Sequence, residues 1–373
     1  MQQDSPGGAE GHRRTPEGEG VRRLKGVAEI SGHADLKAAA RDWERYSSDL
    51  LGDTDVRDYK QLPLEVDPPE HGVYRKILDP VFGRAAITAV APALRAVARR
   101  LVAGFAETGS VEAVHELAMP MVVHSIGISL GRESDIDEYL SWGADTWQTL
   151  DDGSRDGTLL HEYLDRVLAQ AKANPGDDAF SLIATADFDG RELTHTEMVG
   201  LASILLTGGR DTVISLISGS MWHLAGDPEA RAALAADPSR IPTAVEELLR
   251  YLSPLPSMER VATAHVEGDW GEADAGEVVL LGFAKANHDR RVFQEPAALD
   301  LERKPNRHLA FGNGPHTCIG LHLARIETHV FLEELLAAVP DWHIEGEPQI
   351  TWGEFAGSEV PVYFGALPIE AGS

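Results

Sequence analysis

The stretch HLAFGNGPHTCIGLHLARIETHVFLEELLAAV, residues 308–339, carries the most informative pattern in the sequence. Gly312, Gly314 and Gly320 surround Cys318, and apolar residues at helical spacing follow, which predicts a glycine-rich loop leading into a long helix. A thiol at the start of a helix meets the positive end of the helix dipole and free backbone N–H groups, and both favour the thiolate. A lone cysteine is more often a small buried apolar residue. The glycines, which let backbone come close to a flat or bulky ligand, favour instead a thiolate that binds a metal or attacks an electrophile.

The same stretch leaves a second interpretation open. His316 and His322 lie close to Cys318 in sequence, and either imidazole could act as the base for a cysteine nucleophile. A cysteine-dependent hydrolase is therefore an alternative to a metal-binding thiolate.

A second informative segment spans residues 194–226. Thr194 and Glu197 form a capping box at its start, and Gly226-Asp227-Pro228 marks its end. The residues between are almost all apolar or small, which is typical of a helix buried on all sides. The sequence therefore predicts one long helix through the centre of the molecule.

This predicted helix contains the sequence Gly208-Gly209-Arg210-Asp211-Thr212. Each glycine costs a helix interior about 1 kcal/mol relative to alanine, and a buried acid is costly unless it is paired. One interpretation is a kinked helix with a satisfied polar pair. The other is that the glycines admit a flat ligand, beside which Asp211 and Thr212 provide a path for protons.

Composition excludes several classes of protein. The chain has 373 residues with 33 basic and 60 acidic side chains, a net charge of −27, which argues against nucleic acid and anionic membranes as partners. Its one cysteine rules out an intramolecular disulfide. No apolar run approaches about 18 residues and no secretory signal is recognisable, so a soluble, cytoplasmic protein without a membrane partner is expected.

The organisation predicted from the sequence is one large, mainly helical domain. Residues 1–20 are rich in glycine, proline and charge and predict a disordered tail, and residues 21–373 form the domain. Helices are expected in 33–48, 68–106, 110–130, 194–226 and 244–260, and strands in 21–31, 261–301 and 361–367.

Taken together, these motifs resemble the bacterial cytochrome P-450 monooxygenases over about residues 21–367. The segment Phe311–Gly320 matches the family's F-G-x-G-x-H-x-C-x-G loop at every fixed position. The family's E-x-x-R matches Glu247 to Arg250, its central A/G-G-x-D/E-T matches 208–212, and its D-P-P-E-H-x-x-x-R matches 67–75.

The resemblance implies a P-450 fold with a minor β-rich lobe and heme b, iron protoporphyrin IX, as the cofactor. It implies Cys318 as the iron ligand, Asp211 and Thr212 as the pair that delivers protons to bound dioxygen, and Gly208 and Gly320 beside the heme. The cationic side chains implied for the heme propionates are His71, Arg75, Arg260 and His316, with His308 as a weaker candidate. Glu247, Arg250 and Arg303 are implied to form a buried ion-pair triad behind the heme.

The implied reaction is the insertion of one atom of O2 into a small organic substrate, by hydroxylation or epoxidation in bacterial secondary metabolism or catabolism. Electrons are expected from NAD(P)H through a separate reductase and a ferredoxin or flavodoxin, because one cysteine cannot hold an iron–sulfur cluster. A catalytically inactive heme-binding accessory protein of the same fold is an alternative. Residues 131–180 look short for the family's paired lid helices. The substrate-facing segments are expected in 49–66, 205–212, 254–258 and 355–358.

Overall fold

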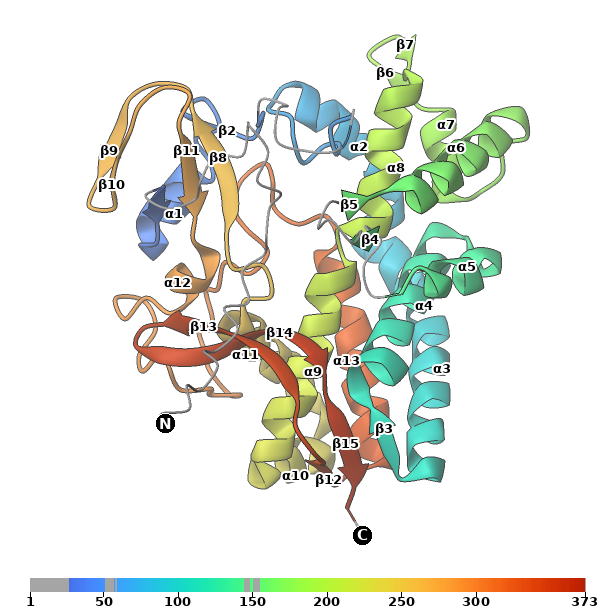
Figure 1. Ribbon diagram of the computed structural model, residues 1–373, viewed down its shortest axis with the longest axis vertical. Coiled ribbons are helices and arrows are strands. Elements are labelled where there is room, and N and C mark those ends of the chain that lie inside the picture. Colours follow the sequence, from blue (N-terminus) through green and yellow to red (C-terminus); the bar gives the residue numbers. More distant parts are fainter. Residues whose placement is uncertain (1–26, 51–56, 58, 144–147, 150–154, 373) are drawn as a thin grey trace, which may run out of the picture.

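The computed structural model describes residues 27–50, 57, 59–143, 148–149 and 155–372, and it divides the long central helix predicted from the sequence into two. α8 (His195–Thr207) begins with the expected capping box between Thr194 and Glu197, and α9 (Arg210–Gly226) follows it. Gly208 and Gly209 form the turn between the two helices, at the centre of the molecule (Figure 1). The prediction of one continuous helix is therefore wrong at the two adjacent glycines of the segment, where two residues of low helix propensity follow one another.

Glycine also divides the helical region predicted over 68–106. α2 (Glu70–Phe82) ends at Gly83, and α3 (Arg84–Thr108) begins directly after it. Gly83 has extended backbone angles, φ −59° and ψ 149°, so the chain turns there between two helices.

Most of the remaining helices lie on one side of the molecule, whereas α1 (His33–Ala39) and α12 (Phe283–Asn287) lie on the other side, beside β8 (Met258–Ala262) and β11 (Val278–Leu281) (Figure 1). The other helices are the π-helical η1 (Ala113–Ala118), α4 (Met119–Leu130), the 3-10 turn η2 (Glu133–Asp135), α5 (Ile136–Ser141), α6 (Thr158–Ala173), α7 (Ala179–Ala184), α10 (Pro228–Ala236), the 3-10 turn η3 (Pro238–Arg240), α11 (Ile241–Leu252) and α13 (Leu321–Ala338). The long α13 packs against α3, α4, α9, α10 and α11. The helices α6 and α7 lie in a stretch for which the sequence predicted no helix.

The strands form small separate sheets rather than one large sheet. One sheet has the order β1-β11-β8-β2, from β1 (Ala28–Ile30), β11 (Val278–Leu281), β8 (Met258–Ala262) and β2 (Tyr46–Ser47). A second sheet joins β12 (Trp342–Ile344), β15 (Pro368–Ala371) and β3 (Ser110–Glu112). The remaining strands pair in twos: β4 (Gln148–Thr149) with β5 (Arg155–Asp156), β6 (Asp187–Phe188) with β7 (Arg191–Glu192), β9 (Val266–Gly268) with β10 (Gly271–Ala273), and β13 (Gln349–Phe355) with β14 (Ser358–Ala366).

Two apolar cores hold these elements, and the cysteine segment runs from one to the other. The larger core joins the helices with the C-terminal strands, and the smaller core lies around the first sheet, α1 and α12. Leu309 belongs to the smaller core, whereas Ile319 packs against the larger one. The glycine-rich loop between them therefore lies at the junction of the helical and β-rich parts.

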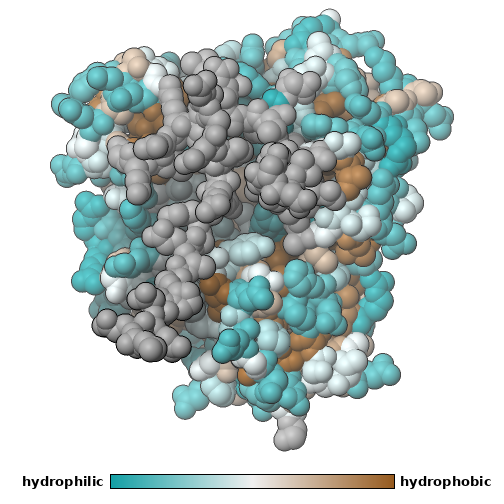
Figure 2. Space-filling view, viewed as in Figure 1, coloured by the Kyte–Doolittle hydropathy of each residue, from teal (hydrophilic) through white to brown (hydrophobic). Residues whose placement is uncertain are grey.

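Some helical stretches are more apolar than the sequence analysis expected. Glu70–Thr108, Ala113–Leu130 and His195–Gly226 are long and apolar enough to cross a membrane by length and composition. The expectation that no stretch has this property is therefore wrong. In the second and third stretches most of the apolar window is buried inside the protein. Hydrophilic side chains dominate the face seen in Figure 2, with smaller apolar areas among them.

The predicted tail, residues 1–20, lies outside the described residues. So do parts of two segments that the sequence analysis singled out, 49–66 and 131–180.

Candidate heme-thiolate site

The loop before α13 has a shape that requires glycine. Gly312 and Gly314 have left-handed φ angles of 70° and 80°, and a Cβ at Gly314 would lie 2.4 Å from the carbonyl oxygen of Ala40. The backbone N–H of Cys318 donates to the carbonyl of Phe311 at 2.9 Å and closes the loop. These constraints fix the cysteine just before the first turn of α13.

The sulfur of Cys318 lies deep in the protein and still has an open approach. Burial raises the pKa of the Cys318 thiol, while the backbone N–H of Gly320 and the charges of Arg75 and Arg325 act in the opposite direction. The residue is nevertheless exposed in this structure. Protein atoms thus surround the sulfur on most sides, and a ligand can reach it from the remaining side.

Four basic side chains gather beside this loop from three parts of the chain. His71 and Arg75 come from α2, Arg260 from β8, and His316 from the loop itself. The rings of His71 and His316 lie 4.4 Å apart, and Arg75 Nη1 donates to the carbonyl of Thr317 at 2.5 Å. The hydroxyl of Ser48 hydrogen-bonds His316 Nε2 at 2.9 Å.

Burial disfavours the positive charge of all four groups, and neighbouring cations add to this effect at the two histidines. Burial, with the charge of Arg75, lowers the pKa of His71 to about 4. Burial and the neighbouring Arg260, His71 and Arg75 lower the pKa of His316 to about 3. Burial also lowers the pKa of Arg260 to about 10. A ligand with negative charge would offset both the burial and the repulsion.

Two of these groups also lack polar partners among the described residues. Arg260 is 6% exposed and donates a hydrogen bond to the carbonyl of Glu259. No carboxylate of the described residues lies within ion-pair distance of its guanidinium. His71 Nε2 is buried without a hydrogen-bond partner. The nearby carboxylate of Asp67 is already used by Ser47 and Ser48. A buried guanidinium and imidazole without anionic partners fit a ligand that carries carboxylates beside a thiolate-bound metal.

His308 lies outside this group, so its implied role at the propionates is not supported by its contacts. Its Nε2 pairs with Glu246 at 3.0 Å and its Nδ1 accepts the N–H of Ala310. Burial alone would raise the pKa of Glu246, but hydrogen bonds from Arg325 and His308 lower it to about 2. Both ring nitrogens of His308 are thus occupied by a network that ties α11 to α13. No sequence pattern indicated this network, because its partners lie 62 and 79 residues apart.

Glu247, Arg250 and Arg303 come together as a buried ion-pair triad. Arg250 donates to both carboxylate oxygens of Glu247 at 2.7 and 2.8 Å, and Arg303 Nε lies 3.0 Å from one of them. Glu247 and Arg250 are 0% exposed. The guanidinium of Arg250 also donates to the carbonyls of Asn287, Pro296 and Ala298. The triad therefore joins α11 to the chain that leads into the cysteine loop.

The central break presents its residues to different surroundings. Gly208 and Gly209 are exposed, Asp211 is exposed rather than buried, and Thr212 is half-buried. A Cβ at Gly209 would meet no atom within 4 Å. The hydroxyl of Thr212 donates to the carbonyl of Gly209 at 3.3 Å, a long contact. Space at Gly209 and a weakly held hydroxyl at Thr212 are what a ligand-facing helix turn needs, whereas a Cβ at Gly208 would lie 2.9 Å from the carbonyl oxygen of Ile204.

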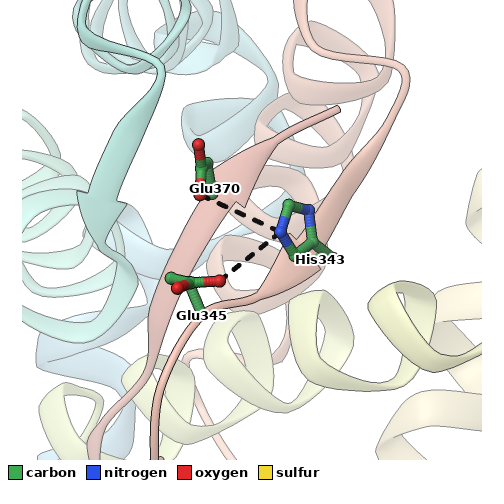
Figure 3. Close-up of side chains that lie close together, drawn as sticks. All are labelled: His343, Glu345 and Glu370. Atoms are coloured by element: carbon green, nitrogen blue, oxygen red, sulfur yellow. Dashed lines mark ion pairs between the residues drawn. The ribbon is translucent and has the colours of Figure 1, made fainter. Parts of the chain in front are cut away.

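A further group of possible metal ligands lies far from the cysteine in sequence. His343 Nε2 is 3.6 Å from a carboxylate oxygen of Glu345 and 3.9 Å from one of Glu370, across the paired strands β12 and β15 (Figure 3). All three side chains are exposed, and no other feature indicates a ligand. We regard the group as a surface ion-pair cluster.

The chain is similar to a known protein family, to curated proteins and to solved structures. A family model described as "Cytochrome P450" matches residues 155–339. The cytochrome P450 monooxygenase PikC of Streptomyces venezuelae is 33% identical over 95% of this chain and 86% of its own length. A steroid C26-monooxygenase of Mycobacterium tuberculosis (strain CDC 1551 / Oshkosh) is 32% identical over 79% of this chain and 82% of its own. Among solved structures, "The structure of a carbohydrate active P450" superposes with a TM-score of 0.86 at 32% identity, over 95% of this chain and 94% of that one.

Proposed function

The chain belongs to the cytochrome P450 family of monooxygenases, and we propose that it binds heme b with Cys318 as the iron ligand. The observation that carries the proposal is the exposed Cys318 beside four basic groups that form no ion pair with a described carboxylate. A thiolate-ligated heme supplies O–O bond cleavage, because the thiolate pushes electron density toward the iron. Family membership removes the cysteine hydrolase alternative. In keeping with this, neither His316 nor His322 makes a hydrogen bond with the sulfur in the described part of the chain.

The basic group would hold the two heme propionates. Arg260, His71, Arg75 and His316 are the candidates, and His308 is left out because both of its ring nitrogens are engaged. Two carboxylates placed here would give the buried guanidinium of Arg260 a partner and favour the charged forms of the histidines. The backbone N–H of Gly320, which already hydrogen-bonds the sulfur, would weaken the electron donation of the thiolate.

Asp211 and Thr212, which follow Gly208 and Gly209 in the chain, would supply the protons that oxygen activation requires. Asp211 is exposed and can exchange protons with water. The hydroxyl of Thr212 has only the long contact to Gly209 to give up before it donates elsewhere. The pair therefore supports an oxygen-activating enzyme rather than an accessory heme protein.

The substrate would be a small organic molecule that receives one oxygen atom from O2. Relatives are named for erythromycin, steroid and carbohydrate chemistry, and this supports hydroxylation or epoxidation in bacterial secondary metabolism or catabolism as the proposed oxidation. Residues 205–212, 254–258 and 355–358 are the described segments expected to contact it. NAD(P)H would supply electrons through a reductase and a ferredoxin or flavodoxin, and the cytoplasm is where these donors occur.

The spectrum of the reduced protein with carbon monoxide tests the iron ligand. The wild-type protein is expected to give the thiolate-type carbon monoxide band, and Cys318→Ala is expected to lose it. Thr317→Ala, at the neighbouring residue, serves as the control and should keep the band. A band retained in Cys318→Ala would refute the proposal.

Replacement of Thr212 by alanine tests proton delivery. With a surrogate ferredoxin and reductase, Thr212→Ala should release a larger fraction of its electrons as hydrogen peroxide, since general acid–base groups contribute about 10²–10⁴-fold in rate. Heme content should stay unchanged. An unchanged peroxide fraction would show that another group delivers the proton.

A further inference from the structure

Arg210 is the one residue of the glycine-glycine-arginine-aspartate-threonine segment to which the proposed chemistry gives no role. It is the first residue of α9, and it is 3% exposed. A long cationic side chain is seldom buried at this level, so its surroundings must compensate for the lost hydration.

The guanidinium of Arg210 points to the end of α5. Its Nη1 and Nη2 each lie 3.3 Å from the carbonyl oxygen of Tyr139, and Nη2 also donates to the carbonyl of Gly143. The carbonyl of Tyr139 belongs to the last turn of α5, and that of Gly143 lies just after the helix. Backbone acceptors at this end of a helix have no partner within the helix. A cation is favourable at this end of a helix.

Apolar side chains enclose the rest of Arg210. Val123 and Ile126 of α4, Trp142 and Leu206 line the space around it, and that space leaves no room for a water molecule. In the wild-type protein the guanidinium, rather than water, therefore satisfies the carbonyls of Tyr139 and Gly143.

The position of Arg210 in the helix separates it from the ligand-facing residues. Successive residues of a helix are about 100° apart, so Arg210 points roughly 200° away from both Gly208 and Thr212. The turn thus has two sides. We call the side with Gly209 and Thr212 the open side, and the side on which Arg210 contacts α5 the closed side. α5 is itself held by Tyr139, whose hydroxyl hydrogen-bonds Tyr163 of α6 at 2.5 Å.

We propose that Arg210 is a positioning residue that fixes the break in the central helix to the end of α5, and thereby sets the orientation of Thr212. Gly208 and Gly209 have no side chains of their own, so the backbone of this turn has high conformational freedom unless its neighbours hold it. The effect on Thr212 rests on the proposed role of that residue in proton delivery, whereas the anchoring of the two segments does not.

Hydrogen–deuterium exchange of the heme-loaded protein tests the anchor directly. In Arg210→Gln, backbone amides of 136–143 and of 208–213 should both exchange faster, by about 10- to 100-fold, as expected for losing hydrogen bonds from a charged donor. Arg210→Lys keeps the charge but not the forked donor and should fall between Arg210→Gln and wild type. Faster exchange in one segment alone would overturn the proposal.

Arg231 provides a matched control at the other end of α9. It is 4% exposed and donates to the carbonyls of Leu224 and Trp342, so it is also a buried arginine that anchors backbone. Arg231→Gln should lower stability, leave exchange in 136–143 and 208–213 unchanged, and leave the peroxide fraction per heme unchanged.

The peroxide assay separates this inference from the proposed function. Arg210→Gln should raise the peroxide fraction, and the double variant Arg210→Gln/Thr212→Ala should show no increase beyond Thr212→Ala alone. If Thr212→Ala has no effect, the proton-delivery role fails while the exchange data still decide on the anchor. If Thr212→Ala raises peroxide and Arg210→Gln does not, the positioning role is wrong.

Discussion

Replacing Glu327 by glutamine should stabilise the protein, and the gain should grow with pH. Glu327 lies on α13 and is 2% exposed, and its Oε2 has no hydrogen-bond partner. No basic side chain of the described residues lies within ion-pair distance of it. Burial raises the pKa of Glu327 from 4.5 to about 8, with the hydroxyl of Ser125 acting weakly in the opposite direction.

The sign and size of the effect follow from this shift. Between pH 4.5 and 8 the folded protein keeps a proton on Glu327 that the unfolded chain releases, so stability falls as pH rises through this range. One pKa unit corresponds to about 1.4 kcal/mol, so the carboxyl costs up to about 4 kcal/mol near pH 7.5 and almost nothing below pH 4.5. Glutamine has a similar shape and never has to take up the proton, and therefore removes the pH-dependent part of the cost.

The assay is urea unfolding followed by circular dichroism at pH 5.0 and pH 7.5, with the same heme concentration for wild type and variant. The difference in unfolding free energy should be a few kcal/mol larger at pH 7.5. Glu334→Gln on the same helix is the control of opposite sign. Arg99 and Arg95 lower the pKa of Glu334, so its carboxylate is paired at pH 7.5, and the substitution should destabilise the protein by removing these pairs. An effect of Glu327→Gln that is equal at both pH values would refute the reasoning, since it would mean that the carboxyl has a cationic partner.

Two further predictions concern the fold around the site. Glu247→Ala should cost about 3–5 kcal/mol and give little heme-loaded protein, because it leaves two arginines without their carboxylate, whereas removing the exposed Glu302 should cost about 1 kcal/mol or less. Normal heme content with altered substrate affinity in Glu247→Ala would contradict a structural role. Gly219→Ala should lower the melting temperature through a cost of about 1–3 kcal/mol, because its Cβ would lie 2.7 Å from a leucine methyl group, while Gly104→Ala in α3, whose Cβ would meet no atom within 4 Å, should not. Equal melting temperatures for the two alanine variants would show that the core yields at Gly219.

The sequence identified the parts of the site that depend on neighbours in the chain. The cysteine loop and the pairing of Glu247 with Arg250 are local patterns, and a glycine or an i, i+3 spacing has the same geometric meaning wherever it occurs. The capping box at Thr194 is of the same kind and formed as predicted. Local rules were therefore sufficient for these features.

Contacts between distant segments could not be predicted in this way. The resemblance implied His308 as a weaker candidate for the heme propionates, but Glu246, 62 residues earlier, occupies its ring. No role was assigned to Glu327 from the sequence, because its burial depends on the packing of α13 against α4. In both cases the deciding partner comes from another helix, and no spacing in the sequence encodes it.

The central break shows how one short segment serves two purposes. The glycines lower helix propensity and leave an open side, which by itself would make the turn a loosely ordered part of the chain. The buried arginine that follows them restores order from the closed side, through backbone carbonyls at the end of α5. A side chain anchored to carbonyls holds its neighbours from the closed side of the turn. Order and reactivity at this turn are therefore supplied by different residues, and this is why the arginine can be tested separately from the threonine two positions later.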